Sequence, residues 1–172
     1  MTEEFFDIVD DTDTVVGSAS RDEVHRSGLL HRSTHLLVFD SRGRVLLQKR
    51  SMEKDSFPGR WDSSVSGHVD RGEWYDQCVV REASEEIGIV LDGVPEKLFK
   101  IDACEETSQE FTWAYRTLHD GPFHVNEQEI SEVRWFSEEE VCLLLDSERE
   151  SFSPAFSLVW TRLRDGGDFE KS

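Results

Sequence analysis

The chain has 172 residues, with 19 Lys and Arg against 37 Asp and Glu, which gives a formal net charge of −18 at pH 7. Such an acidic chain cannot neutralise many phosphates, so we expect it to bind neither nucleic acid nor an anionic membrane surface. A phosphorylated ligand would need metal ions or a local basic pocket. The hydrophobic fraction of 37% excludes a disordered acidic tail, and the length favours a single domain over residues 1–172.

The first residues lack the basic and apolar regions of a secretory signal, and no later apolar run is long enough to span a bilayer. The three cysteines, Cys78, Cys104 and Cys142, are far apart and form no CxxC pair. They therefore indicate neither a disulfide framework nor a thiolate zinc site. We expect a cytoplasmic protein, and the sequence leaves its oligomeric state open.

The predicted elements follow the hydrophobic pattern and the turn residues. In chain order they are strands at 5–9 and 14–18, a helical turn at 21–25, strands at 34–39 and 45–49 around a tight turn, a mostly irregular segment at 51–69, a helix at 73–87, strands at 98–103, 110–117 and 132–136, and two helices that begin at Ser137 and Ser153. Strands and helices do not alternate regularly. This order favours an α+β fold with a mixed sheet and flanking helices.

The predicted helix at 73–87 carries three carboxylates, Glu82, Glu85 and Glu86, at positions i, i+3 and i+4. They project together from one helical stripe, which we expect to be exposed. Crowded carboxylates repel one another unless a cation lies among them, and Mg²⁺ prefers such oxygen ligands and bridges to phosphates. The alternative is an ordinary solvated face of an acidic helix. The buried stripe of the same helix is formed by Val79, Val80, Ala83 and Ile87.

The residues around this triad extend the pattern to a longer motif. Gly67 is followed after five residues by Glu73, and after seven more by the run from Arg81 to Ile89, REASEEIGI. Every fixed position of this box at 67–89 matches the signature of the Nudix hydrolases, so the chain resembles that family. The resemblance implies a Nudix-type α/β/α sandwich with a mixed β-sheet. It also implies Mg²⁺- or Mn²⁺-dependent hydrolysis of a nucleoside or other organic diphosphate linked to a further group.

The resemblance also implies roles for individual residues. The implied metal ligands are the Gly67 carbonyl, Glu82, Glu85 and Glu86. The implied structural positions, which brace the loop and the helix, are Glu73, Arg81 and Gly88. The implied catalytic residues are Glu82, Glu85 and Glu110, with Glu82 or Glu110 as the general base and Glu127 or Glu129 in reserve. We expect the loops at 104–109 and 119–128 to set specificity, although they do not identify the group attached to the diphosphate.

Further stretches are similar to the type I isopentenyl-diphosphate isomerase branch of the superfamily. They are Leu30–Ser33, LHRS, Leu46–Arg50, LLQKR, Phe57–Trp61, FPGRW, and Ser64–His68, SVSGH. By this likeness His25, His31 and His68 form a second divalent-metal site, joined by Glu110, although His25 and His31 are one residue closer together than in the isomerase pattern. Arg50 and Lys54 would hold the diphosphate. Phe57, Trp61 and Trp113 would stack on a base or an isoprenoid, or belong to the core.

Two positions depart from the isomerase pattern. Ser66 stands where the isomerase has its catalytic Cys, and Ser108 stands where a second acidic ligand is expected. A serine hydroxyl cannot readily replace a thiol as acid or base. Together with the intact box, these departures favour hydrolysis. The alternatives are an isomerase, a non-catalytic diphosphate-binding module and an acidic scaffold without a ligand.

Overall fold

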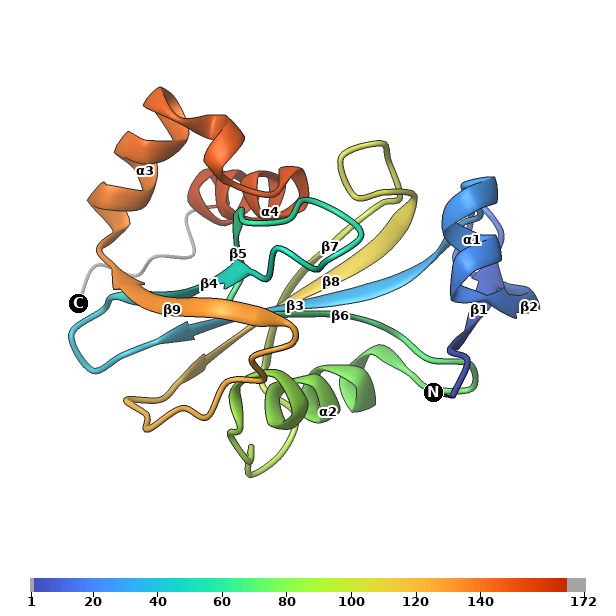
Figure 1. The fold of residues 1–172 in the computed structure, drawn as a ribbon, viewed down its shortest axis with the longest axis horizontal. Helices are drawn as coiled ribbons and strands as arrows, with labels where there is room; N and C mark the ends of the chain where they lie inside the picture. The colour runs from blue at the N-terminus through green and yellow to red at the C-terminus, as the bar shows by residue number, and fades with distance from the viewer. Residues whose placement is uncertain (1, 167–172) are drawn as a thin grey trace.

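The computed structural model describes residues 2–166 (Figure 1). The elements in chain order are β1 (Phe5–Val9), β2 (Val15–Ser20), α1 (Arg21–Ser27), β3 (His31–Phe39), β4 (Val45–Arg50), β5 (Trp61–Asp62), β6 (Val65–His68), α2 (Tyr75–Ile87), β7 (Glu96–Ile101), β8 (Glu110–Leu118), β9 (Ile130–Phe136), α3 (Glu138–Ser147), the 3-10 turn η1 (Arg149–Ser151) and α4 (Pro154–Asp165). None of the described helices is long and apolar enough to cross a membrane.

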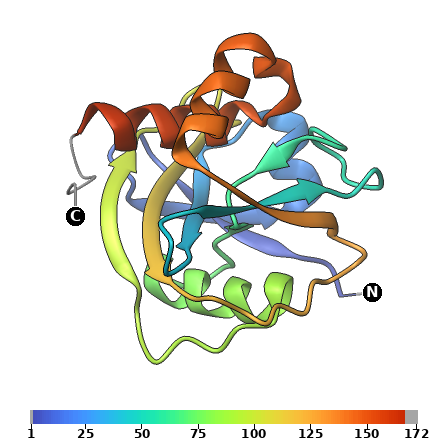
Figure 2. The same ribbon diagram turned by 90° about the vertical axis from the view of Figure 1, so that its left-hand side faces the viewer.

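Seven of the strands form one mixed sheet. Its central order is β5-β4-β3-β8-β7, with β6 paired to β3 and β9 paired to β4. The β3–β8 pair is parallel and the other pairs are antiparallel. Helix α2 covers one face of this sheet, and α3 and α4 cover the other (Figure 2). The predicted α+β sandwich with a mixed sheet is therefore confirmed.

The two faces of the sheet make two separate cores. Along β3 the side chains of Leu36 and Val38 pack with α2, whereas Leu37 between them packs with α3 and α4. Successive residues of a strand point to opposite faces, so a continuous apolar run is buried on both sides. The α2 core includes Val79, Ala83 and Ile87 of the predicted buried stripe, and its fourth member, Val80, is only partly buried against that core.

The ends of the helices follow local signals. The hydroxyl of Ser137 accepts a hydrogen bond from the Glu140 amide, and Ser153 caps α4 just before Pro154. Helix α2 ends at Gly88, whose φ of 69° favours glycine. A Cβ at this position would also lie 2.8 Å from the carbonyl oxygen of His124.

Strands β1 and β2 form a separate hairpin that, with α1, lies at the end of the sheet where β3 and β8 begin (Figure 1). Its own buried core is small, consisting of Phe6, Ala19 and Val24. A buried carboxylate, Asp13, adds a polar connection, since it accepts hydrogen bonds from Arg32 on β3, Tyr75 on α2 and Lys100 on β7. This connection attaches the hairpin to three elements of the main domain.

Several element boundaries differ from the predicted ones. Helix α2 begins at Tyr75 rather than at residue 73, because Glu73 lies in the preceding loop and accepts from the Asp70 amide. Strand β3 begins at His31, three residues early, because it pairs with β8 from that point. The segment 51–69 contains β5 and β6, whose polar sequences show no strand pattern and are extended through pairing with β4 and β3.

Candidate active site

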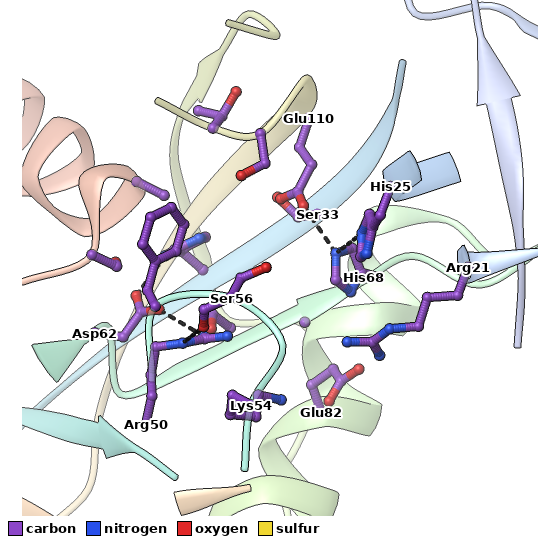
Figure 3. A pocket seen from close by; sticks show the side chains of 18 of the residues that line it. Arg21, His25, Ser33, Arg50, Lys54, Ser56, Asp62, His68, Glu82 and Glu110 are labelled. Carbon is purple, nitrogen blue, oxygen red and sulfur yellow. Dashed lines mark hydrogen bonds and ion pairs between the residues drawn. The ribbon is translucent and has the colours of Figure 1, made fainter. Parts of the chain in front are cut away.

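A cavity of about 300 Å³ lies between the N-terminal hairpin, β6, α2 and the start of β8. Figure 3 shows His25, His68 and Glu110 on one side of it and Arg50 with Asp62 on the other. The structure thus brings most of the predicted site residues to one place. The predicted site residues that line the cavity are His25, Arg50, Lys54, Phe57, Gly67, His68, Arg81, Glu82, Glu85, Glu86, Glu110 and Glu129.

Gly67 and Glu82 are in direct contact. A Cβ built on Gly67 would lie 2.3 Å from Cδ of Glu82, far inside any real contact distance. Gly67 lies on β6, opposite Thr34 of β3, so the strand holds its backbone in place. The lack of a side chain at residue 67 is therefore what allows the Glu82 carboxylate to pack against this strand.

Arg81 links α2 to the loop before it. Its guanidinium donates through Nε and Nη2 to both carboxylate oxygens of Glu73, at 2.8 and 2.9 Å, and through Nη2 to the carbonyl of His68 at 3.1 Å. It also donates through Nη1 to Glu82 at 2.8 Å and to Glu85 at 3.0 Å. One guanidinium fork thus fixes the loop and two carboxylates of the box together.

The three carboxylates of the box differ in exposure, which corrects the expectation of a shared exposed face. The side chain of Glu85 is 58% exposed, whereas Glu82 is 14% exposed and Glu86 only 5%. Glu86 turns toward the sheet and accepts a hydrogen bond from Gln48 of β4. The expectation failed because α2 packs closely on the sheet, and the edge of its buried stripe includes residue 86.

Burial changes the acidity of these carboxyl groups. Desolvation raises the pKa of Glu82 to about 7, despite the opposing charge of Arg81, with the charge of Glu85 raising it further. Burial, together with the charge of Glu82, raises the pKa of Glu86 well above its usual range. Both groups are thus destabilised as anions unless a cation lies nearby.

A second cluster joins three histidines to one carboxylate. The donor atoms of His25, His31, His68 and Glu110 all lie within 4.8 Å of one another. Glu110 Oε1 lies 2.9 Å from Nε2 of His68 and 3.2 Å from Nε2 of His31. Residues 31 and 110 are directly opposite in the parallel β3–β8 pair, and α1 supplies His25. Phe6 stacks on the ring of His68 with centroids 4.7 Å apart.

The two ring nitrogens of His31 have different neighbours. Nδ1 lies 2.8 Å from the carbonyl of Leu29, which can only accept, so Nδ1 carries a proton and donates it. The buried Nε2 faces Oε1 of Glu110 at 3.2 Å but makes no hydrogen bond of suitable geometry with the described residues. Burial alone would raise the pKa of Glu110, but His68 and His31 hold it well below its usual range. Burial and the neighbouring His68 lower the pKa of His25 to about 4.

Arg50 and Lys54, the two residues predicted to bind a diphosphate, are both ion-paired. Arg50 donates through Nε to the carbonyl of Ser56 at 3.0 Å and through Nη1 to Asp62 at 3.1 Å. Lys54 donates to Glu129. These cations come from β4 and the loop that follows it, and both line the cavity, as do Arg21 and Arg81.

Some expected residues lie elsewhere. Glu127 is exposed and does not line the cavity, and neither do Trp61 and Trp113, so of the two alternatives for these rings the structure bears out the core. Trp61 packs edge-on against Phe136, and Trp113 packs at the α2 core. The cavity is instead lined by several residues that the motifs do not mark: Glu4, Phe6, Arg21, His35, Asp62 and Ser153.

Sequence comparison shows to which family this fold and site belong. The family model described as NUDIX domain matches residues 29–156, so the chain belongs to the Nudix hydrolases. It is an enzyme of the class that acts on phosphoanhydride bonds. The hairpin and the whole of α1 precede the matched residues, although they supply one wall of the cavity.

Individual relatives cover most of the chain. The chain is 35% identical over 164 residues to an uncharacterized Nudix hydrolase of Yersinia pestis, covering 92% of this chain and 87% of that protein. It is 34% identical over 148 residues to the uncharacterized Nudix hydrolase YfcD of Escherichia coli, covering 83% of this chain and 79% of YfcD.

Two solved structures are similar in fold. The DR0079 protein of Deinococcus radiodurans has a TM-score of 0.81 at 26% identity, covering 92% of this chain and 98% of that one. The NUDIX domain of Shewanella oneidensis NrtR, solved in complex with ADP ribose, has a TM-score of 0.59 at 20% identity, covering 80% of this chain and 88% of that one. The second likeness shows the fold alone.

Proposed function

We propose that this Nudix hydrolase cleaves the diphosphate bond of a small organic diphosphate, such as a nucleoside diphosphate linked to a further group, with the help of Mg²⁺ or Mn²⁺. The observation that carries the proposal is the arrangement of charge in one cavity: three box carboxylates from α2 lie with Arg50 and Lys54 around the same 300 Å³ space. The carboxylates suit a hard cation and the basic side chains suit phosphate oxygens. The cavity also takes residues from the N-terminal hairpin, which supports a single domain over residues 1–172.

The donor groups fit a hard divalent ion. Gly67, whose backbone lies against Glu82, offers a carbonyl, and Glu82, Glu85 and Glu86 offer six carboxylate oxygens. Glu86 is 5% exposed and accepts one hydrogen bond from the described residues, so a buried anion is left with little compensation. A cation held by these four residues would supply that compensation, neutralise the phosphate charge and position the attacking water.

The protein groups have separate roles in this proposal. Glu82 Oε1 accepts from Arg81, which leaves Oε2 to take a proton from the attacking water. Glu110 is the second candidate for this base, although its Oε1 already lies against His68 and His31. Glu129 remains in reserve beside Lys54. Arg50 and Lys54 bind the phosphate oxygens and stabilise charge on the leaving group.

The proposed function is tested by a screen of organic diphosphates with detection of released phosphate and phosphorylated products. The screen is run with Mg²⁺, with Mn²⁺ and with a chelator. Hydrolysis that requires the metal and leaves a monophosphate product supports the proposal. Hydrolysis that persists in chelator, or no hydrolysis of any diphosphate in the panel, would contradict it.

We also propose that His25, His31, His68 and Glu110 hold a second divalent metal. Four donors within 4.8 Å of one another need only a small contraction to reach bonds of about 2.1 Å to a common ion. Nε2 of His31 supports this fit, because it points toward the cluster without a hydrogen bond of suitable geometry, while Nδ1 is fixed by the carbonyl of Leu29. Imidazole is a softer ligand than carboxylate, so this site would favour Mn²⁺ or Zn²⁺ over Mg²⁺.

Purified protein is therefore expected to retain about one equivalent of a transition metal after mild washing, on the scale of a three-histidine site. His68→Ala is expected to lose that metal, because it removes one ligand from the centre of the cluster. Elemental analysis of both proteins measures the difference. His119→Ala is the matched control, since His119 contacts Phe123 and does not line the cavity. Equal, near-zero metal in all three proteins would refute the second site.

The histidine cluster favours one alternative function, isomerisation of isopentenyl diphosphate. Ser66 argues against it, because it occupies the isomerase thiol position, lies in the cavity wall and offers only a hydroxyl. If isopentenyl diphosphate is accepted, we expect hydrolysis to the monophosphate and phosphate. Product analysis by mass spectrometry and phosphorus NMR checks this, and dimethylallyl diphosphate as the main product would establish the alternative.

A further inference from the structure

A buried polar chain lies behind Arg50 at the cavity wall. The side chain of Asp62 is 4% exposed and that of Arg50 is 14% exposed, and their closest atoms are 3.1 Å apart. Figure 3 shows this pair with Ser56 on the side of the cavity away from His25 and His68. None of the sequence motifs marks Asp62.

Both oxygens of Asp62 are engaged. Oδ2 accepts from Nη1 of Arg50, while Oδ1 accepts from the amide of Ser63 at 2.8 Å. Oδ1 also lies 3.7 Å from Nδ1 of the buried His35, and that nitrogen is 2.8 Å from the hydroxyl of Ser63. These contacts fix the carboxylate in rotation as well as in position.

The fixed carboxylate in turn fixes the guanidinium. Arg50 uses Nε on the carbonyl of Ser56 and one Nη1 hydrogen on Asp62, so two of its five N–H groups are occupied. A planar guanidinium held at two points has a defined orientation, and its remaining donors keep their direction. An unpaired arginine on a flexible side chain would have to lose that freedom each time it bound a ligand.

We propose that Asp62 is a positioning residue, which orients Arg50 toward the diphosphate without touching the substrate. This inference rests on the proposed function, because it assigns Arg50 to the phosphate oxygens. The carboxylate of Asp62 places a negative charge near an anionic ligand, which is unfavourable for binding. The hydrogen bond from Arg50 offsets that charge, and the fixed orientation of the guanidinium favours binding.

The test measures binding of methylenediphosphonate, a diphosphate analogue without a hydrolysable bridge, by calorimetry in the presence of Mg²⁺. Asp62→Asn keeps the size of the side chain and removes its charge, so we expect the Kd to rise about tenfold, on the scale of one charge-assisted hydrogen bond. Arg50→Ala and the double variant Arg50→Ala with Asp62→Asn are expected to bind equally weakly, because Asp62 acts only through Arg50.

Asp40→Asn is the matched control. Asp40 is equally buried and also accepts from an arginine, Arg44, but it lies in the β3–β4 turn and does not line the cavity. We expect this variant to bind the analogue as the wild type does. Wild-type affinity in Asp62→Asn, or losses that add in the double variant, would overturn the proposal.

A second variant covers the case in which Asp62→Asn does not fold. Arg50→Lys leaves Asp62 in place and keeps the charge, but an ammonium group lacks the fork that spans Asp62 and Ser56. We expect the same loss of affinity in this variant, and unchanged affinity would overturn the inference. If the wild type binds the analogue but hydrolyses no diphosphate, the proposed function is refuted and the role of Asp62 is not. No binding by the wild type would refute both.

Discussion

Replacement of Glu86 by Gln is expected to lower kcat by about a thousandfold, on the scale of removing a principal electrostatic stabiliser. The amide keeps the size of the side chain but removes one anionic metal ligand. The same change is expected to leave the melting temperature of the metal-free protein unchanged or raise it, because burial disfavours this anion. Steady-state kinetics and thermal unfolding check the two effects separately.

Metal dependence separates a lost ligand from a damaged fold. Millimolar Mg²⁺ is expected to raise the melting temperature of the wild type, since ligands that bind only the folded state stabilise it. The increase should be much smaller in Glu86→Gln. Glu139→Gln, on the exposed first turn of α3, is the matched control and should behave as the wild type. Near wild-type turnover of Glu86→Gln at saturating Mg²⁺ would contradict the assignment of the metal site.

Gly67→Ala is expected to lower kcat by about a hundredfold, the scale expected when a catalytic group moves by roughly 1 Å. Its new Cβ would lie 2.3 Å from Cδ of Glu82, so either the carboxylate or β6 must shift. The shift would disturb the contact of Glu82 with Arg81. Kinetics of the variant, with circular dichroism as a check on folding, measure the effect.

A glycine in another strand provides the control for this change. Gly17 on β2 has no atom within 4 Å of a built Cβ, so Gly17→Ala introduces no contact. We expect it to keep wild-type turnover. If Gly67→Ala and Gly17→Ala were equally active, close packing of Glu82 against β6 would not matter for catalysis.

The sequence predicted the parts of this site that short-range spacing determines. Glu82, Glu85 and Glu86 lie on one helix, so their separation follows from helical geometry alone. The order of strands and helices likewise predicted a mixed sheet. The exposure of Glu86 was not predictable in this way, because it depends on how closely α2 packs on Gln48 of β4.

The remaining parts of the site depend on contacts between distant segments. Asp62 follows a proline- and glycine-containing loop without any strand pattern. Its contacts are with Arg50 of β4 and His35 of β3, which only the folded sheet brings to it. The grouping of the histidines came from a family resemblance rather than from a local pattern. Phe6, which stacks on His68, is an ordinary strand residue in sequence.

The parallel pairing of β3 with β8 also determines when this cavity can form during folding. The hydrogen bond between the hydroxyls of Ser33 and Thr112 joins residues 79 positions apart. The segment between them must fold or form a loop before this contact can be made. Closing long loops is slow, because their entropy is lost before the contacts compensate for it. A growing chain that has already formed α2 would carry every carboxylate of the box. It would still lack Glu110 and the side of the cavity beside it, so the cavity is complete only after β8 docks.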